Sequence, residues 1–326
     1  KRKNISFLNL KMENKLKILF ITPVGFNKCT GGGITFRNLF KGLKADQIAT
    51  VHNDDLIQKK DICKKFYKIT PKEQVKIYRY FGSYKNINNN SKIQVNKDNK
   101  KIRLLKVVKN LILGDSLPEY FSYSDEMKSF IKDFQPNIIY TILGSNFIMS
   151  LVDEIHQDLN IPLVLHFMDD WQSCIYKKGI FSILERRKMK YLLNKLIKKS
   201  KTCLAISEEM RIEYSKRYKR EFFSFQNCIE IDGLEIEKQY KKRNKNKFSF
   251  LYTGSILPFA QLSSLIDISK AIKELINEGY NISLEIYTPI SLSKNYLKRF
   301  PKHPSIIFRD VIEDDKEFFR TLKNAS

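Results

Sequence analysis

Residues 17–23 read Lys-Ile-Leu-Phe-Ile-Thr-Pro, and Gly31-Gly32-Gly33 follows, just before a helical run from Ile34 to Leu43. An apolar strand, a glycine turn and a helix are typical of the first unit of a parallel α/β layer. A second strand ends in polar groups, because residues 163–171 read Leu-Val-Leu-His-Phe-Met-Asp-Asp-Trp. Ligands of open parallel sheets bind outside the carboxyl ends of the strands. The two stretches therefore predict one ligand cleft.

Apolar strand-like runs alternate with amphipathic runs along most of the 326 residues. This alternation predicts an α/β fold with two Rossmann-like domains that face a cleft. The predicted strands are 17–22, 49–52, 137–142, 162–167, 202–206, 222–226, 248–253, 282–287 and 305–308. The predicted helices are 34–44, 102–113, 124–134, 145–159, 178–200, 208–218, 262–278, 291–299 and 314–324, and Ser207 is the expected N-cap of the helix that follows it.

Two polar stretches divide this pattern. Residues 83–101 are rich in asparagine and lysine and are expected to be a surface insertion, and residues 241–247 are expected to be an interdomain linker. The predicted domains are therefore 12–240 and 247–326. The alternation would continue with another strand after Ser326, so we expect the second domain to be incomplete.

The composition restricts the possible partners. The net charge is +24, which favours nucleic acid, an anionic membrane surface or a phosphate-bearing substrate. The five cysteines are widely spaced and form no Cys-x-x-Cys pair, and the four histidines have no metal-ligand spacing. We expect a reducing, cytoplasmic setting, no metal site and no cofactor.

Three segments could bind a ligand. The Gly31–Gly33 turn allows backbone amides to approach an anion, although it matches neither a dinucleotide fingerprint nor a P-loop and is equally typical of a simple βα turn. His166, Asp169, Asp170 and Trp171 gather at one strand end. The aspartates could accept hydrogen bonds from sugar hydroxyls or act as a base, or they could only cap a helix.

The third segment is the turn at Gly254 and Ser255, which opens the second domain. Gly254 permits close approach of a ligand to the backbone, and the Ser255 hydroxyl can donate a hydrogen bond. An ordinary βα turn is at least as good an explanation of these two residues.

Two segments combine basic and apolar residues at helical spacing. Residues 177–201 hold ten lysines and arginines and one acid, Glu185, and residues 101–113 have a similar character. A helix with a solvated basic face would have this pattern, as would a helix that docks on anionic lipid. The second interpretation predicts a peripheral position on the inner face of the cell membrane.

Taken in order, these stretches resemble the GT-B glycosyltransferases, particularly the retaining family 4 type of capsule, O-antigen and other surface polysaccharide synthesis. The resemblance covers Leu16 to about Asp310 and rests on six stretches: 17–23 with Gly31–Gly33, 165–171, 205–210, 225–229, 252–255 and 284–287. It implies a hexosyltransferase that moves a sugar from a nucleotide sugar to a lipid-linked or saccharide acceptor without a bound metal.

The resemblance also implies roles for single residues. Gly31–Gly33 would lie near the donor phosphates and the acceptor, His166 would contact the donor sugar, and Asn227 would lie where the chain crosses into the second domain. Two features depart from the family. Ser255 and Ala260 stand where the family usually has an arginine and a lysine, and the paired glutamates that hold the donor would follow Ser326. We therefore expect this length of chain to be inactive.

Two alternatives remain. A non-catalytic module that binds RNA or a membrane would use the basic surface, but the sequence has no RNA-binding signature, so nucleic acid is not favoured. An NAD(P) enzyme is weakened by the missing third fingerprint glycine, and Asp54 after the second predicted strand is the one residue that supports it.

Overall fold

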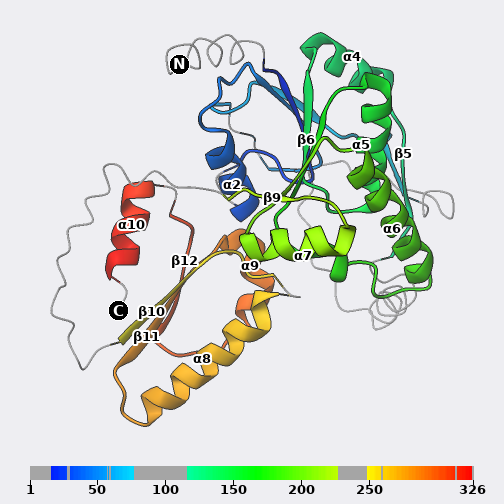
Figure 1. Ribbon diagram of the computed structural model, residues 1–326. Helices are drawn as coiled ribbons and strands as arrows, with labels where there is room; N and C mark the ends of the chain where they lie inside the picture. The colour runs from blue at the N-terminus through cyan, green and yellow to red at the C-terminus, as the bar shows by residue number, and fades with distance from the viewer. Residues whose placement is uncertain are drawn as a thin grey trace, which may run out of the picture. The chain divides into compact units, whose positions relative to one another are not determined.

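The computed structural model describes residues 16–27, 30–56, 58, 60–76, 116–226, 248–257, 260–312 and 314–324 (Figure 1). The chain divides into two compact units, one formed by residues 1–25 and 40–227 and the other by residues 26–39 and 228–326. The predicted insertion 83–101, the predicted helix 102–113 and the predicted linker 241–247 lie outside the described residues. The predicted domain limits, 12–240 and 247–326, stay predictions.

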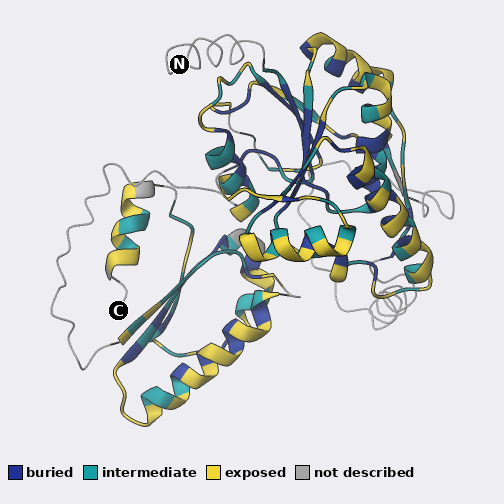
Figure 2. Cartoon of the chain, viewed as in Figure 1, coloured by how far each residue is buried: buried dark blue, intermediate teal, exposed yellow. Residues whose placement is uncertain are grey.

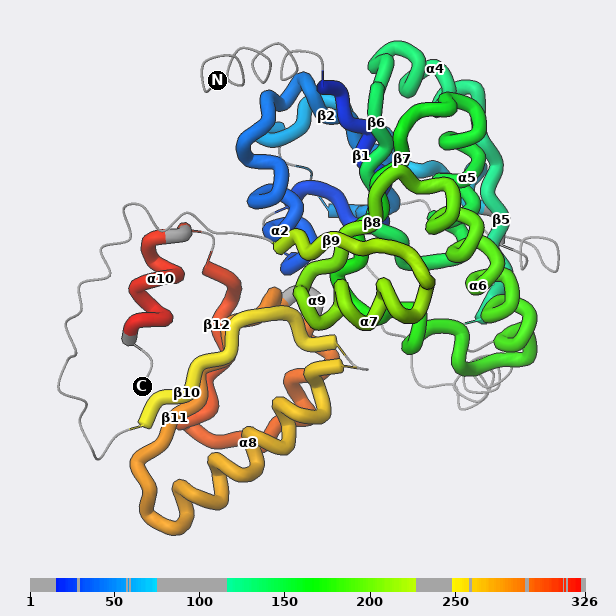
Figure 3. Tube along the Cα trace, viewed as in Figure 1, coloured from blue at the N-terminus to red at the C-terminus, as the bar shows by residue number. Residues whose placement is uncertain are grey.

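The first unit contains a parallel seven-stranded sheet in the order β3-β2-β1-β6-β7-β8-β9, whose path can be followed in Figure 3. Its strands are β1 (Ile18–Thr22), β2 (Ile48–His52), β3 (Lys65–Lys68), β6 (Ile138–Thr141), β7 (Leu163–Phe167), β8 (Thr202–Ala205) and β9 (Phe223–Ser224). Strand β1 pairs with β2 on one side and with β6 on the other, so the strand order reverses there. That reversal is the switch point of a doubly wound sheet.

Helices separate these strands in sequence. They are α4 (Asp125–Phe134), α5 (Asn146–Leu159), α6 (Ser182–Lys199) and α7 (Glu208–Tyr218). Serines cap three of them, and the Ser207 hydroxyl accepts a hydrogen bond from the Met210 amide over 3.2 Å, which confirms the predicted cap of α7. A short antiparallel pair, β4 (Gln74–Lys76) and β5 (Glu119–Phe121), completes the described part of this unit.

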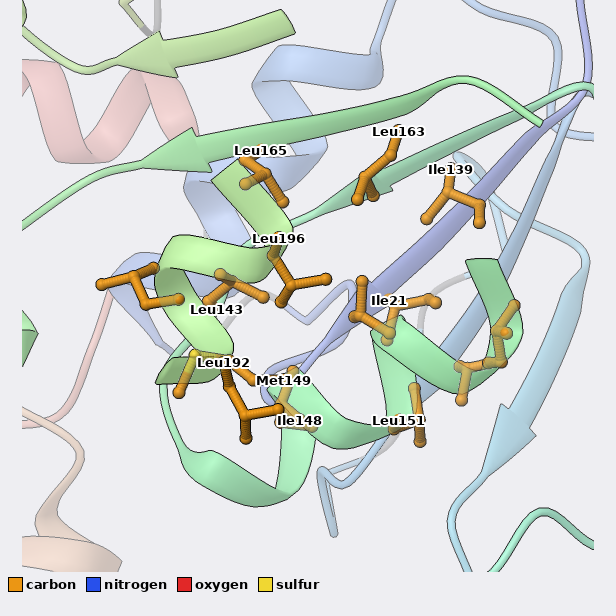
Figure 4. Packing of buried hydrophobic residues seen from close by; sticks show 14 of the residues in the cluster. Ile21, Ile139, Leu143, Ile148, Met149, Leu151, Leu163, Leu165, Leu192 and Leu196 are labelled. Atoms are coloured by element: carbon orange, nitrogen blue, oxygen red, sulfur yellow. The ribbon is translucent and has the colours of Figure 1, made fainter. Parts of the chain in front are cut away.

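The core of the first unit lies between the sheet and helices α5 and α6 (Figure 4). Every residue of β1, β2 and β7 is buried, as expected for parallel strands covered on both faces. Leu192 and Leu196 of α6 belong to this core together with Leu143 and Leu165 (Figure 4). The same helix leaves its other side exposed (Figure 2).

The second unit contains a parallel three-stranded sheet in the order β10-β11-β12, with strands Phe248–Thr253, Ile282–Tyr287 and Ile306–Arg309. Its helices are α2 (Gly31–Phe40), which the division of the chain assigns to this unit up to Leu39, α8 (Gln261–Asn277), α9 (Ile290–Leu297) and α10 (Asp315–Asn324). Leu262, Leu265 and Ile266 of α8 pack in a separate core with Leu284 and Ile286 of β11. The second unit therefore repeats the βα pattern of the first.

Prediction and structure agree on the long elements and differ on the short ones. Strands β3, β4 and β5 were not predicted. Strand β3 reads Lys-Phe-Tyr-Lys, is only partly buried and lies at the sheet edge, so it lacks the apolar run that marks the central strands. No helix in the described part of the chain is long and apolar enough to cross a membrane.

Candidate functional site

His166 is buried in strand β7, with 2% of its surface exposed. Its Nε2 lies 3.1 Å from the carbonyl oxygen of Phe225, and its Nδ1 lies 2.5 Å from the hydroxyl of Tyr140. A carbonyl oxygen can only accept, so Nε2 carries the proton and Nδ1 accepts from the tyrosine. His166 therefore ties β7 to β6 and to the segment after β9.

Burial also sets the charge of this histidine. Loss of solvation lowers the pKa of His166 to about 4, against a smaller opposing effect of the Phe225 carbonyl. Burial raises the pKa of the Tyr140 hydroxyl, which keeps it protonated as the donor. The imidazole is thus neutral at pH 7, and both of its nitrogen atoms have partners within the protein.

Asp170 follows β7 and is held by three donors. Its Oδ1 accepts hydrogen bonds from the Tyr214 hydroxyl at 2.9 Å and from Nη1 of Arg217 at 2.8 Å, and its Oδ2 accepts one from the Ser173 hydroxyl at 2.5 Å. Burial by itself raises the pKa of Asp170, but the hydrogen bonds from Ser173, Arg217 and Tyr214 outweigh it and leave the pKa below its ordinary value. Asp170 is therefore ionised, and it links the end of β7 to helix α7 through hydrogen bonds.

Asp169 and Trp171 are placed differently. Asp169 is exposed, and its Oδ1 accepts only a long hydrogen bond of 3.3 Å from the backbone amide of Trp171. Trp171 begins the short 3₁₀ helix Trp171–Ser173 and packs partly buried at the edge of the core. Of the two aspartates, Asp169 has the more exposed carboxylate and the one with fewer hydrogen bonds within the protein.

Gly31, Gly32 and Gly33 form the first turn of α2 and not a turn ahead of it. Thr30 caps this helix, because its hydroxyl accepts a hydrogen bond from the Gly33 amide over 3.2 Å. A Cβ at Gly33 would lie 2.5 Å from Cγ of Asn27, so only glycine fits there. The side chain of Asn27 also accepts hydrogen bonds from Thr30, which fixes the start of the helix.

Gly254 and Ser255 lie at the carboxyl end of β10. Gly254 has φ +151°, and its amide donates to the Tyr287 carbonyl over 2.9 Å. The Ser255 carbonyl accepts a hydrogen bond of 2.7 Å from the Tyr252 hydroxyl, which closes the turn. Asn227, the remaining predicted site residue, lies outside the described residues.

A pocket of about 740 Å³ opens at the carboxyl ends of β11 and β12, the edge at which parallel sheets bind ligands. It is lined by Tyr287, Ile290, Phe308, Arg309, Asp310, Val311, Ile312, Asp314 and Glu317. The sequence prediction missed all nine. Their signal was weak, because they come from two strand ends and two helix starts that carry no glycine motif.

The polar side chains of this pocket are mainly acidic. Nε of Arg309 donates to Oε2 of Glu285 over 2.8 Å, and this contact raises the pKa of the guanidinium. The guanidinium also lies 6.0 Å from the centre of the Tyr287 ring. Carboxylates accept hydrogen bonds from sugar hydroxyls, and aromatic rings offer stacking surfaces. The pocket therefore suits a nucleoside better than a diphosphate. Among the described residues, no group of three or more His, Cys, Asp or Glu could hold a metal ion.

No protein-family model and no curated protein matches the chain in sequence. Many solved structures are similar to the chain, among them the following three. HepE from Anabaena, in complex with UDP and glucose, has a TM-score of 0.50 at 14% identity over 91% of this chain and 70% of that chain. Sucrose-phosphate synthase from Thermosynechococcus elongatus has a TM-score of 0.49 at 9% identity and covers 95% of this chain and 74% of that chain. The α,α-trehalose 6-phosphate synthase of Burkholderia multivorans has a TM-score of 0.48 at 8% identity and covers 95% of this chain and 76% of that chain.

The likeness to HepE shows the fold. The chain is an α/β protein of the GT-B type with parallel sheets, as the sequence predicted, and its structural neighbours are GT-B glycosyltransferases.

Proposed function

We propose that the protein is a glycosyltransferase that takes its sugar from a nucleotide-sugar donor. The observation that carries this proposal is the pocket at the carboxyl ends of β11 and β12 in a chain with a GT-B fold. HepE, the neighbour with the TM-score of 0.50, is described in complex with UDP and glucose. A nucleoside diphosphate is therefore the first ligand to test.

The residues of the pocket suggest which groups of the protein bind the ribose, the base and the diphosphate of the donor. The carboxylates of Asp310 and Glu317 are placed to accept hydrogen bonds from ribose hydroxyls, and Tyr287 and Phe308 offer surfaces for a base. The diphosphate requires donors elsewhere, because Ser255 and Ala260 supply no cation at the first turn of this unit. The Gly254 turn is our candidate for that contact, since a glycine lets the backbone approach a phosphate closely.

In the first unit, Asp169 is the candidate polar contact for the transferred sugar or the acceptor, with Trp171 beside it. His166 would take part through its ring edge only after exchanging its bond to the Phe225 carbonyl for one to the sugar. Gly31–Gly33 and Asn227 are retained as candidate binding residues by resemblance alone. We extend the proposal to a retaining, metal-independent hexosyltransferase that acts on a lipid-linked or saccharide acceptor in surface polysaccharide synthesis.

Saturation-transfer NMR with UDP, UDP-glucose, GDP-mannose and ATP tests the donor site. We expect contacts to the base and ribose protons of at least one nucleotide. Glu317→Gln removes one charge from the pocket and should weaken that binding about three- to tenfold, since a hydrogen bond to a charged group is lost. Glu278→Gln, an exposed acid at the end of α8, is the matched control.

Two results would contradict the proposal. One is the absence of contact with any nucleotide for a folded chain. The other is an equal loss of binding in the Glu317 and Glu278 variants, which would place the ligand outside the pocket.

A further inference from the structure

The outer side of α6 exposes large apolar side chains. Ile183 is 66% exposed, Leu184 60% and Tyr191 65%, and Ile180, just before the helix, is 66% exposed. Single exposed apolar residues are ordinary on a protein surface, but a contiguous group marks an interaction site. These four lie within a stretch of twelve residues, so the geometry of α6 decides whether they form such a group.

Helical geometry puts these side chains in one stripe. Ile183, Leu184, Arg187 and Tyr191 are spaced by three and four residues, which places them on the same face of a helix. The opposite side of the helix packs against the core and is buried (Figure 2). Its buried residues are Met189, Leu192, Leu193, Leu196 and Ile197. Burial of the inner face therefore leaves this outer stripe without a partner among the described residues.

Basic residues border the stripe. Arg187 and Lys190 are exposed on the same face and make no ion pair with any residue in the described part of the chain. Nζ of Lys188 lies 5.3 Å from the centre of the Tyr120 ring, which is itself 51% exposed. This contact adds a second aromatic side chain and a third cation beside the helix.

The only acidic residue of helix α6 is buried. Glu185 is 5% exposed, and its Oε2 accepts a hydrogen bond of 2.6 Å from Nδ2 of the buried Asn146. Lys195 and Lys199 near the far end of α6 are paired with Asp153 at 2.5 and 3.0 Å. The first half of α6 thus presents cations and apolar groups to solvent, with no carboxylate of its own to offset them.

We propose that this stripe docks the protein on an anionic lipid bilayer, with α6 lying along the membrane surface. We define the docking stripe as Ile180, Ile183, Leu184, Arg187, Lys190 and Tyr191. Its apolar side chains would enter the boundary between headgroups and acyl chains, and its cations would meet lipid phosphates. The tyrosine suits that boundary because its ring is apolar and its hydroxyl polar.

Charge complementarity selects lipid as the occupant. A protein partner would be expected to meet polar groups of both signs, whereas this surface offers cations around an apolar centre, which is the pattern of a helix at a bilayer interface. The inference does not depend on the proposed transfer reaction, since it concerns a surface of the first unit alone.

Vesicle flotation tests the proposal with the 326-residue chain. We expect binding to vesicles of phosphatidylglycerol and phosphatidylcholine, weaker binding at high salt, and little binding to phosphatidylcholine alone. The Ile183→Ser/Leu184→Ser variant keeps every charge and should bind at least about tenfold more weakly. The Arg187→Glu/Lys190→Glu variant should lose binding by a similar or larger factor.

Controls make changes of the same kind elsewhere in the first unit. Lys132→Glu/Lys216→Glu makes an equal change in charge on exposed lysines of α4 and α7, and Ile212→Ser removes an apolar side chain of α7 that is 56% exposed. Both should bind vesicles within about twofold of the unchanged chain. Circular dichroism confirms that each variant is folded.

Three outcomes would overturn the proposal. The first is failure of the chain to bind the anionic vesicles at low salt. The second is a loss of binding in the controls as large as that in the stripe variants. The third is binding of generic RNA through Arg187 and Lys190 without binding of vesicles, which would make the basic surface a nucleic-acid site.

Discussion

The hydroxyl of Tyr140 lies 2.5 Å from Nδ1 of His166, deep in the sheet of the first unit. The two residues belong to the adjacent strands β6 and β7, and they are 26 positions apart in the chain. The contact fixes the histidine as a neutral acceptor at Nδ1 and a donor at Nε2, which determines what this residue can do.

Removing the tyrosine hydroxyl should destabilise the protein. Tyr140→Phe leaves a buried ring nitrogen without a partner, so we expect the free energy of unfolding to fall by about 1–3 kcal/mol in urea titration. Tyr280→Phe is the control, because Tyr280 is 54% exposed, and it should change stability by less than about 0.5 kcal/mol. Equal stability of the two variants would mean that the Tyr140 bond contributes nothing.

His166 should make stability depend on pH between about 4 and 6.5. The unfolded chain binds a proton near the ordinary pKa, while the folded chain resists protonation down to about 4, so the unfolded state holds more protons in that window. The stabilisation is complete above pH 6.5 and falls by up to about 3 kcal/mol as the pH drops to 4.

Urea unfolding between pH 7.5 and 4.5 measures this effect, and His166→Gln isolates it. The pKa values of His52 and His156 are also lowered, chiefly by burial, so part of the pH dependence should persist in the variant. An unchanged pH dependence in His166→Gln would show that His166 titrates normally in the folded protein.

Replacement of Asp170 should lower the free energy of unfolding more than replacement of an exposed carboxylate nearby. Asp170→Asn weakens the bonds from Tyr214, Arg217 and Ser173, and we expect a loss of about 1–2 kcal/mol after allowance for its partial exposure. Because the pKa of Asp170 is lowered in the folded protein, this contribution is present above the ordinary value and is lost as the pH falls below it.

Glu213→Gln provides the comparison. It removes the other, more exposed carboxylate partner of Arg217 and should cost no more than about 0.5 kcal/mol in thermal or urea unfolding. A loss as large as that of Asp170→Asn would show that Arg217, rather than the carboxylate of Asp170, is the important group.

Gly254 should not tolerate a side chain. Its φ of +151° is unfavourable for other residues, and an added Cβ would lie 3.0 Å from the Tyr252 hydroxyl. We expect Gly254→Ala to lower stability by about 1–3 kcal/mol and to weaken nucleotide binding if the turn contacts the donor. Gly42→Ala, where a Cβ meets nothing within 4 Å, should be nearly neutral.

The double variant Tyr252→Phe/Gly254→Ala separates the two causes. It removes the steric contact and keeps the backbone strain, but it also removes the hydrogen bond from the Tyr252 hydroxyl to the Ser255 carbonyl, so Tyr252→Phe alone is its reference. Relative to that reference, the double variant should recover only part of the stability that Gly254→Ala loses in the unchanged chain. Full recovery, measured by the same urea titration, would assign the whole effect to the Tyr252 hydroxyl.

Much of the fold follows from local pattern. Strands β1, β7, β10 and β11 were predicted within one residue at each end because their apolar runs are continuous or alternate regularly. Helix α7 was predicted with its observed limits, since Ser207 marks its start. The glycine run differed from its prediction: it was predicted as a turn, but with Thr30 as its cap it forms the first turn of α2.

The geometry of the candidate site depends on contacts between distant residues, which no local sequence pattern predicts. The sequence by itself determined that His166, Asp169, Asp170 and Trp171 follow one another at a strand end. Only the tertiary structure decided that Tyr140 and Phe225 occupy both nitrogens of His166, and that Arg217, 47 positions away, holds Asp170. The tertiary structure also buries Glu185 and brings residues between 287 and 317 together to line the pocket. The physical reason is that periodicity reports which side of an element is buried, whereas partners and pockets arise where separate elements pack together.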